Sequence, residues 1–186
     1  VCSSDLKQTG LITFHSPMAN GDFGSELENY TINSFFNTLC GKTNQIYAEN
    51  PLFYNTGKAE GVLFGGNLST LSALCGTDFV PNTEIILFLE DLNEPAYKID
   101  KMLTQLFNIK EIRKNVKGIA IGEFKDTDNT EMVDEVIMEL ALNYNIPVVK
   151  GFKITHGKVK DTVPVGVLTE LDAENGIIKI KDDYVL

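Results

Sequence analysis

The chain has 186 residues, a length that suits one domain, or one domain plus part of another. With 43% hydrophobic and 23% charged residues, its composition is that of an ordinary globular protein. Its formal net charge is −10 at pH 7, from 16 basic and 26 acidic residues. This charge argues against nucleic acid and against an anionic membrane surface as partners, because both are bound through clusters of basic residues.

A strand and a helix are the first elements that the sequence predicts. Leu11–Phe14 is a short apolar run and predicts a strand. Ser25 and Glu28 form an S-x-x-E capping box, and apolar residues then recur at helical spacing. A helix is therefore expected over 26–40, with Gly41 in the position of a C-terminal capping glycine.

A polar segment follows this helix, and the character of the chain then changes. Residues 42–58 contain several asparagines, a proline and a glycine, which predicts a linker. Val62–Phe64 predicts a strand, and the diglycine Gly65-Gly66 a tight turn. Asn67 is expected to cap a short helix that runs to Cys75.

Two buried strands and two helices are expected in the middle of the chain. Ile85–Glu90 is a continuous apolar run that ends in acidic residues, and it predicts a strand buried on both faces. Pro95 is expected at the first position of the next helix. Gly118–Gly122 predicts another buried strand, and Asp128 with Glu131 forms a capping box for a helix that ends near residue 144.

The last part of the chain is rich in strand signals. Ile146–Val149 predicts a strand, with the loop Gly151–Lys158 at its end. After an alternating valine segment, Asn175-Gly176 predicts a hairpin turn into Ile177–Ile180. This mixture of strands and helices indicates an α/β fold class with a β-rich ending.

Three features could carry chemistry, and each has a purely structural alternative. Glu90 and Asp91 end a buried strand, where functional side chains gather in α/β sheets, but they could also be solvated or cap the helix that follows. His156 lies in a polar loop after a strand, where a simple surface histidine is the alternative. Gly65-Gly66-Asn67 could present backbone N–H groups to an anion, although diglycine turns are common.

Metal ligands are scarce in this sequence. Cys2, Cys40 and Cys75 are an odd number of cysteines without C-x-x-C spacing, so they are interpreted as reduced thiols of a cytosolic-type protein. The only histidines are His15 and His156, so we expect no metal site. No stretch approaches the roughly 20 apolar residues of a membrane span, so no membrane partner is expected either.

Five segments carry recognisable motifs in a fixed order. They are Ile12–Met18, close to T-F-H-G-P-M; Ala59–Gly61 with Gly65–Leu68; Leu71–Thr77; Phe88–Pro95 with Tyr97–Leu103; and Gly151–His156. In these segments the chain resembles the LD-carboxypeptidase (muramoyltetrapeptide carboxypeptidase) family of serine peptidases, which includes the microcin C self-immunity peptidases. The resemblance covers about residues 8–186, and its most specific part is the L-E-D-x-x-E run that contains Glu90.

The resemblance implies a two-domain hydrolase with a Ser–Glu–His triad and no cofactor. The serine belongs to an N-terminal α/β (flavodoxin-like) domain, and the acid and base belong to a C-terminal swivelling β/α domain. Glu90 matches the family's catalytic glutamate and His156 its catalytic histidine. A serine needs a histidine to take its proton and a carboxylate to orient that histidine, which is why these residue types occur together. Gly65, Gly66 and Asn67 are the expected substrate-binding residues.

The same resemblance divides the chain into three parts. Residues 1–41 are expected to be a remnant of the N-terminal nucleophile domain, 42–58 a linker and 59–186 the C-terminal LD-carboxypeptidase domain. In such a remnant, the apolar stripe of the 26–40 helix, made of Phe35, Phe36 and Leu39, would be partly exposed and prone to aggregation. His15 is expected to be a structural support near the active-site cleft, with substrate contact as the alternative.

The nucleophile is the residue on which the sequence departs from the family. The resemblance places it upstream of Val1. Ser4-Asp5 imitates the family's S-D step but lies too close to Leu11 for the helix of the nucleophile elbow, so Ser4 is not assigned; one hypothesis is that residues 1–6 are a junction artefact. Ser16, Ser69 and Ser72 occur where the family does not place its nucleophile.

The resemblance therefore implies the C-terminal half of a cytoplasmic serine carboxypeptidase of peptidoglycan recycling. The whole enzyme would release the terminal D-Ala from murein tetrapeptides and form a homodimer, whereas this chain alone is expected to be inactive. Within the family, the alternative is a microcin C-type immunity peptidase that hydrolyses a toxic aminoacyl nucleotide. In another class of protein, the alternative is a binding module that keeps the ligand cleft without catalysis.

Overall fold

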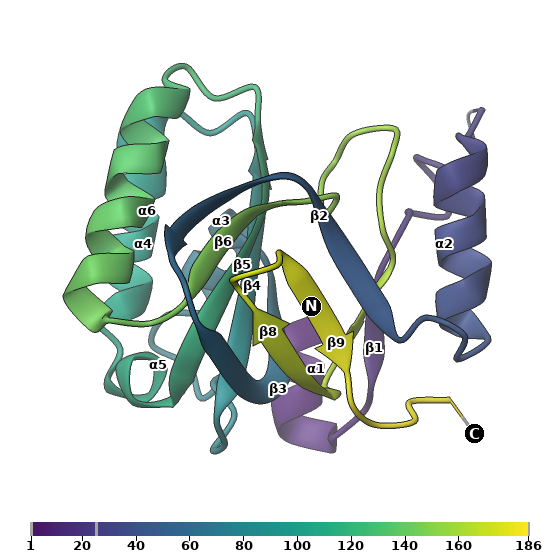
Figure 1. Cartoon of the computed structure of the whole chain (residues 1–186), viewed down its shortest axis with the longest axis horizontal. Coiled ribbons are helices and arrows are strands. Elements are labelled where there is room, and N and C mark those ends of the chain that lie inside the picture. Colours follow the sequence, from purple (N-terminus) through teal and green to yellow (C-terminus); the bar gives the residue numbers. More distant parts are fainter. Residues whose placement is uncertain (1, 25, 186) are drawn as a thin grey trace.

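A closed barrel of seven strands forms the centre of the part of the chain that the computed structural model describes, residues 2–24 and 26–185 (Figure 1). Around the barrel the order is β2-β6-β5-β4-β3-β8-β9, and β9 pairs with β2 to close it. The strands are β2 Gln45–Asn55, β3 Lys58–Asn67, β4 Ile85–Leu92, β5 Val116–Lys125, β6 Val148–Phe152, β8 Leu168–Asp172 and β9 Ile177–Ile180.

Four adjacent strands, β3 to β6, run parallel, and the other pairings are antiparallel. The central strand β4 is buried on both faces, as its continuous apolar run predicted. Ile85, Leu87 and Leu89 belong to the outer core under the helices, whereas Ile86 and Phe88 belong to the core inside the barrel. This alternation decides which of the acidic residues at the end of the strand faces the barrel interior.

Helices cover the outside of the parallel strands. They are α3 Leu68–Ala73, α4 Ala96–Phe107, α5 Lys110–Asn115 and α6 Thr130–Tyr144. In Figure 1, α6 stands in front of α4 on one flank of the barrel, and the two helices contact each other. Their apolar faces, which include Ile99, Leu103, Val133 and Ile137, join the outer core. The α/β fold class and the β8–β9 hairpin are thus confirmed.

The N-terminal elements are α1 Cys2–Thr9, β1 Thr13–His15 and α2 Asn29–Leu39. In Figure 1, α1 lies at the lower end of the barrel, whereas β1 and α2 lie on the flank opposite α4 and α6, with α2 apart from the barrel. β1 pairs with β7, Val163–Val165, in a separate two-stranded sheet. The apolar stripe of α2 is partly exposed, as expected, with Phe36 56% exposed. The polar face of this helix contacts the protein: Thr31 and Ser34 bond the backbone of residues 158–162.

Two local predictions between residues 42 and 67 are wrong. The expected linker 42–58 is mostly strand β2, whose pairing with β6 and β9 brings together residues distant in sequence, so local composition could not reveal it. The barrel therefore includes residues that the expected boundary at 59 leaves out. Gly65-Gly66 is not a turn either, because both glycines lie in β3 and pair in register with Phe88 and Leu89 of β4. The three-part division itself stays a prediction.

The helix caps also differ in detail from the predicted ones. Ser25 lies outside the described residues, and α2 begins after Glu28 without a side-chain cap. Asn129, not Asp128, caps α6 by accepting from the backbone N–H of Met132. The carboxylate of Asp128 instead accepts from the N–H of Ala96 at 2.8 Å, and so caps α4.

The remaining caps are closer to expectation. Pro95 is the N-cap of α4 and not its first helical residue. Gly41 has a φ of +68° just beyond α2, which confirms the C-terminal capping glycine. Among residues 2–24 and 26–185, no helix is both long and apolar enough to cross a bilayer.

Candidate active site

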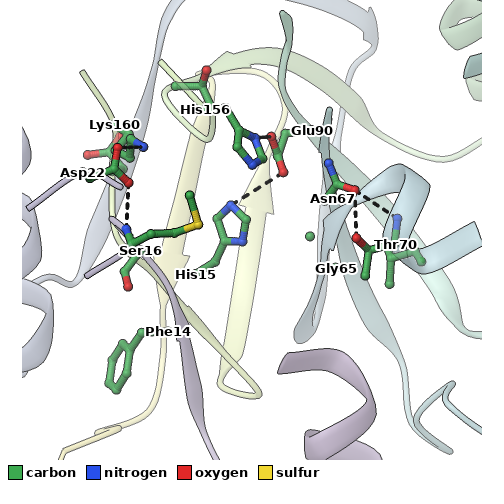
Figure 2. Close-up of a pocket in the computed structure, with 15 residues that line it drawn as sticks. Phe14, His15, Ser16, Asp22, Gly65, Asn67, Thr70, Glu90, His156 and Lys160 are labelled. Carbon is green, nitrogen blue, oxygen red and sulfur yellow. Dashed lines mark hydrogen bonds and ion pairs between the residues drawn. The ribbon is translucent and has the colours of Figure 1, made fainter. Parts of the chain in front are cut away.

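Glu90 and His156 meet at the carboxyl ends of parallel strands. Glu90 lies near the end of β4, and His156 lies in the loop after β6. The Oε2 atom of Glu90 is 2.7 Å from Nδ1 of His156, which confirms the expected contact (Figure 2). A carboxylate only accepts hydrogen bonds, so this contact favours the tautomer with the proton on Nδ1 and leaves Nε2 as the base.

The alternation of β4 places Glu90 and Asp91 on different faces. Glu90 follows Ile86 and Phe88 on the inner face and is fully buried. Burial raises the pKa of its carboxyl above the ordinary value, while His156 opposes this rise. A raised pKa means that Glu90 depends on its neighbours to remain ionised.

Asp91 is occupied by structural contacts on the opposite face. One carboxylate oxygen accepts from the N–H of Ser69 at 2.8 Å and from its hydroxyl at 2.6 Å, and the other accepts from the amide of Asn67 at 2.7 Å. Asp91 therefore ties β4 to the start of α3. The expectation that it is solvated or caps the helix after Pro95 is wrong.

His15 brings a second imidazole to Glu90. Its Nε2 atom lies 3.9 Å from Oε1 of Glu90, as the dashed line in Figure 2 marks. The ring packs edge-on against Phe88, with centroids 5.5 Å apart. Burial, helped by the charges of His156 and Lys160, lowers the pKa of His15 to about 4. His15 is therefore uncharged at neutral pH.

Glu90, His156 and His15 line one cavity of about 280 Å³. The same cavity is lined by Gly65, Gly66 and Asn67, so the structure brings together all five residues that the sequence singled out as catalytic or substrate-binding. The rest of its wall comes from the β1 segment and its following loop, from α3 and from the His156 loop: Phe14, Ser16, Met18, Asp22, Thr70, Leu71, Thr155, Lys160 and Asp161.

The two glycines in this wall differ in the space that a side chain would have. A Cβ at Gly65 would lie 1.9 Å from the backbone oxygen of Phe88, so the close approach of β3 and β4 requires a glycine there. A Cβ at Gly66 would have no atom within 4 Å. Since Gly66 lines the cavity, a side chain at this position would extend into open space.

Two backbone N–H groups at the N-terminus of α3 already donate hydrogen bonds to side-chain acceptors. The N–H of Ser69 donates to Asp91, and the N–H of Thr70 donates to Asn67. The predicted cap by Asn67 is thus confirmed, but an added anion at this helix end would compete with the carboxylate of Asp91. The structure gives no support to the anion site that the diglycine suggested.

The loop that carries His156 is held from both sides. Next to His156, the hydroxyl of Thr155 donates to Glu123 and accepts from the N–H of Gly157. Farther along, Asp161 accepts from the hydroxyl of Tyr30 at 2.8 Å. These contacts join the loop to β5 and α2 and hold His156 near Glu90.

Lys160 is a wall residue that sequence reasoning missed. Its ammonium is 2.9 Å from Asp22, and its side chain is 7% exposed. A lysine four residues after a loop histidine carries no recognisable signal, and its pairing with a residue far earlier in the chain depends on the tertiary fold. Within the described part of the chain, no group of three or more His, Cys, Asp or Glu side chains is placed to hold a metal.

The family model described as the LD-carboxypeptidase C-terminal domain matches residues 60–171, which is more than half of the chain. The chain therefore belongs to the LD-carboxypeptidase family. It is 34% identical to the probable murein peptide carboxypeptidase of Bacillus subtilis (strain 168), over 86% of this chain and 53% of that protein. It is 29% identical to the microcin C7 self-immunity protein MccF of Escherichia coli, over 96% of this chain and 61% of that protein.

A solved structure supports the same assignment. The crystal structure of muramoyltetrapeptide carboxypeptidase from Oxalobacter formigenes matches with a TM-score of 0.83 at 30% identity, over 97% of this chain and 65% of that chain. The resemblance that the sequence motifs carried is thus confirmed. The chain spans between 53% and 65% of the length of these three relatives.

Proposed function

We propose that this chain supplies the acid and the base of a serine LD-carboxypeptidase that releases the terminal D-Ala from murein tetrapeptides in peptidoglycan recycling. The observation that carries the proposal is the contact of 2.7 Å between Glu90 and His156. The relationship to a probable murein peptide carboxypeptidase supports the choice of substrate.

His156 is the general base and then the general acid of this reaction. Its Nε2 atom takes the proton of the serine hydroxyl as the serine oxygen attacks the carbonyl carbon of the L,D-peptide bond. The ring then gives that proton to the nitrogen of the leaving D-Ala, and an acyl-enzyme remains. Water attacks the acyl-enzyme in the second half of the reaction, with His156 again taking and returning a proton.

Glu90 acts on the histidine and not on the substrate. Its Oε2 atom holds the proton on Nδ1 of His156 and stabilises the imidazolium that forms in each step. For this role Glu90 must be ionised, and its complete burial makes the charge sensitive to the groups around it.

The nucleophile, in this proposal, is a serine of a longer protein and lies outside these 186 residues. Two serines close to the site have structural partners, because Ser69 donates to Asp91 and Ser72 donates to Gln105. Ser16 lines the cavity and is the in-chain residue that a test of this proposal must include.

The remaining parts of the proposal follow from the cavity and the family. Gly65, Gly66 and Asn67 form the wall against which we place the peptide. The reaction as written needs neither a metal nor a cofactor. We further propose a cytoplasmic enzyme that works as a homodimer in its full-length form.

An immunity peptidase of the microcin C type is the second candidate. The relationship to MccF covers 96% of this chain, more than the 86% covered by the murein enzyme. The higher identity to the murein enzyme, 34% against 29%, favours the first candidate. The two differ in substrate and share the same acid–base pair.

Hydrolysis by the longer protein tests the proposal. We expect D-Ala release from a murein tetrapeptide, with little turnover of an aminoacyl nucleotide. The reverse preference would select the immunity peptidase. Binding of the tetrapeptide without hydrolysis of either substrate would select the non-catalytic binding module.

A further inference from the structure

One oxygen of the Glu90 carboxylate has no hydrogen bond within the described residues. Oε2 is bound to His156, whereas Oε1 is buried and lacks a partner. Leaving a buried charged acceptor unsatisfied is strongly unfavourable, and such atoms in native proteins call for an explanation. The Nε2 atom of His15 lies 3.9 Å from Oε1, and the side-chain amide of Asn67, which donates to Asp91, also acts on the Glu90 carboxylate.

The imidazole of His15 is held in this direction by its surroundings. Its backbone pairs with Val163 in the β1–β7 sheet. Its ring packs edge-on against Phe88, which lies two positions before Glu90 on the same face of β4. A movement of about 1 Å would bring Nε2 and Oε1 to hydrogen-bond distance, and contacts of this kind commonly tighten when an active site is occupied.

The charges around this pair determine which form of His15 fits. His156 from the loop after β6 and the side chain of Asn67 lower the pKa of Glu90, whereas the charge of Asp91, next along β4, raises it. His156 and Lys160 act on His15 in turn, and Lys160 is itself paired with Asp22. Burial of the ring disfavours a charged His15, and the two cationic or potentially cationic groups close by repel it, so the neutral ring is the form that the site accepts.

We propose that His15 is a positioning residue that donates its Nε2–H to Oε1 of Glu90 and thereby keeps the carboxylate ionised and directed at His156. The role rests on the proposed function of the Glu90–His156 pair. A neutral donor suits this task because it stabilises the glutamate without competing for its charge. A protonated His15 would form a second ion pair with Glu90 and weaken the stabilisation of the His156 imidazolium.

The protonation of the three side chains can be measured directly in the 186-residue chain. Nitrogen NMR of the histidine rings reports which nitrogen carries the proton, and carbon NMR of the Glu90 carboxyl reports its ionisation. We expect His15 as the neutral Nε2–H form from pH 5 to pH 8. The Nδ1–H form, or a charged His15 in this range, would overturn the proposal without any substitution.

Variants of His15 separate the donor from the bulk of the ring. His15→Phe removes the N–H, so the titration midpoint of Glu90 should rise by about one pH unit or more. His15→Gln carries an amide N–H near the position of Nε2 and should restore the midpoint. His15→Asn has the same amide on a shorter side chain, which does not reach Oε1, and should behave like His15→Phe. Equal midpoints in the wild-type chain and in His15→Phe would contradict the proposal.

This experiment is independent of hydrolysis. The NMR measurements need neither a nucleophile nor a substrate, so they remain decisive if the longer protein proves inactive. Conversely, D-Ala release with an unchanged Glu90 midpoint in His15→Phe would retain the proposed function and reject the role of His15.

Discussion

Glu90 and Asp91 are consecutive residues of β4, and their carboxylates bind on opposite faces of the strand. Glu90 contacts the ring of His156 at 2.7 Å, whereas Asp91 accepts from the backbone and hydroxyl of Ser69. Both are buried, at 0% and 3% exposure, so burial alone does not distinguish them. Their bonding partners distinguish the two residues. These partners predict different consequences when each carboxylate is replaced by an amide.

Replacing each carboxylate by an amide should separate catalysis from stability. In the longer protein, Glu90→Gln should keep the fold and lower kcat by about 10⁴-fold, as in other serine triads, because an amide cannot stabilise the imidazolium. Asp91→Asn should lower kcat far less but reduce the free energy of unfolding by about 1–3 kcal/mol, since the carboxylate accepts four hydrogen bonds that an amide cannot all accept. Steady-state kinetics and urea unfolding measure the two effects.

The opposite ranking would change the assignment of the acid. If Asp91→Asn proved the more damaging to kcat at unchanged stability, Asp91 and not Glu90 would orient the histidine.

Gly65 and Gly66 offer a matched pair of substitutions in the cavity wall. Both have positive φ, +149° and +142°, so an alanine is strained at either position. Only at Gly65 does the new Cβ also collide with the backbone of β4. Gly65→Ala should therefore unfold at clearly lower urea concentration than Gly66→Ala, whose own loss should be about 1–3 kcal/mol.

Kinetics of the longer protein give the second half of this test. Gly66→Ala places a methyl group in the cavity and should raise KM for the tetrapeptide. An unchanged KM would show that the peptide does not lie against this wall.

The neutral His15 predicts how stability depends on pH. Its pKa falls from about 6.5 in the unfolded chain to about 4 in the folded one, so the unfolded chain binds more protons between these values. The contribution of His15 to stability is therefore complete above about pH 6.5 and is lost as the pH falls toward 4. Because Glu90 has a raised pKa and acts in the opposite direction, the test is a difference between variants.

Urea unfolding of the wild-type chain and of His15→Gln at pH 4.5 and pH 7 measures this difference. The wild-type chain should lose up to about 3 kcal/mol more than the variant on acidification. Equal losses would mean that His15 is protonated equally easily in both states.

Elements with a strong local pattern were predictable from the sequence. The apolar run of β4 and the helical stripe of α6 require no knowledge of their neighbours. The prediction for β2 was wrong because this strand is stabilised by pairing with β6 and β9, which are distant in sequence. The predicted capping residue of α6 was wrong by one position, since Asp128 and Asn129 are both good capping residues. Only the tertiary fold directs Asp128 to α4.

The candidate site was predictable only through its motifs. From position alone, Glu90 could have been a solvated or capping acid and His156 a surface histidine. The family resemblance identified them as a catalytic pair, and the structure brings the two side chains into contact. No pattern revealed the approach of His15 to Glu90 or the pairing of Lys160 with Asp22, because each joins segments that meet only in the folded chain.

The chain alone provides a control for the nucleophile. Without its serine, a triad loses about 10⁶-fold in kcat, so the purified 186-residue chain should release no measurable D-Ala from a murein tetrapeptide. Turnover that disappears in Ser4→Ala or in Ser16→Ala would place the nucleophile within this chain.

D-Ala release by the longer protein, compared between the wild-type enzyme and His156→Gln, tests the central claim most directly. We predict release by the wild type and a loss of about 10⁴-fold or more in kcat for the variant, provided that the variant remains folded. Release by His156→Gln at the wild-type rate would contradict the assignment of the Glu90–His156 contact as the acid–base pair of the reaction.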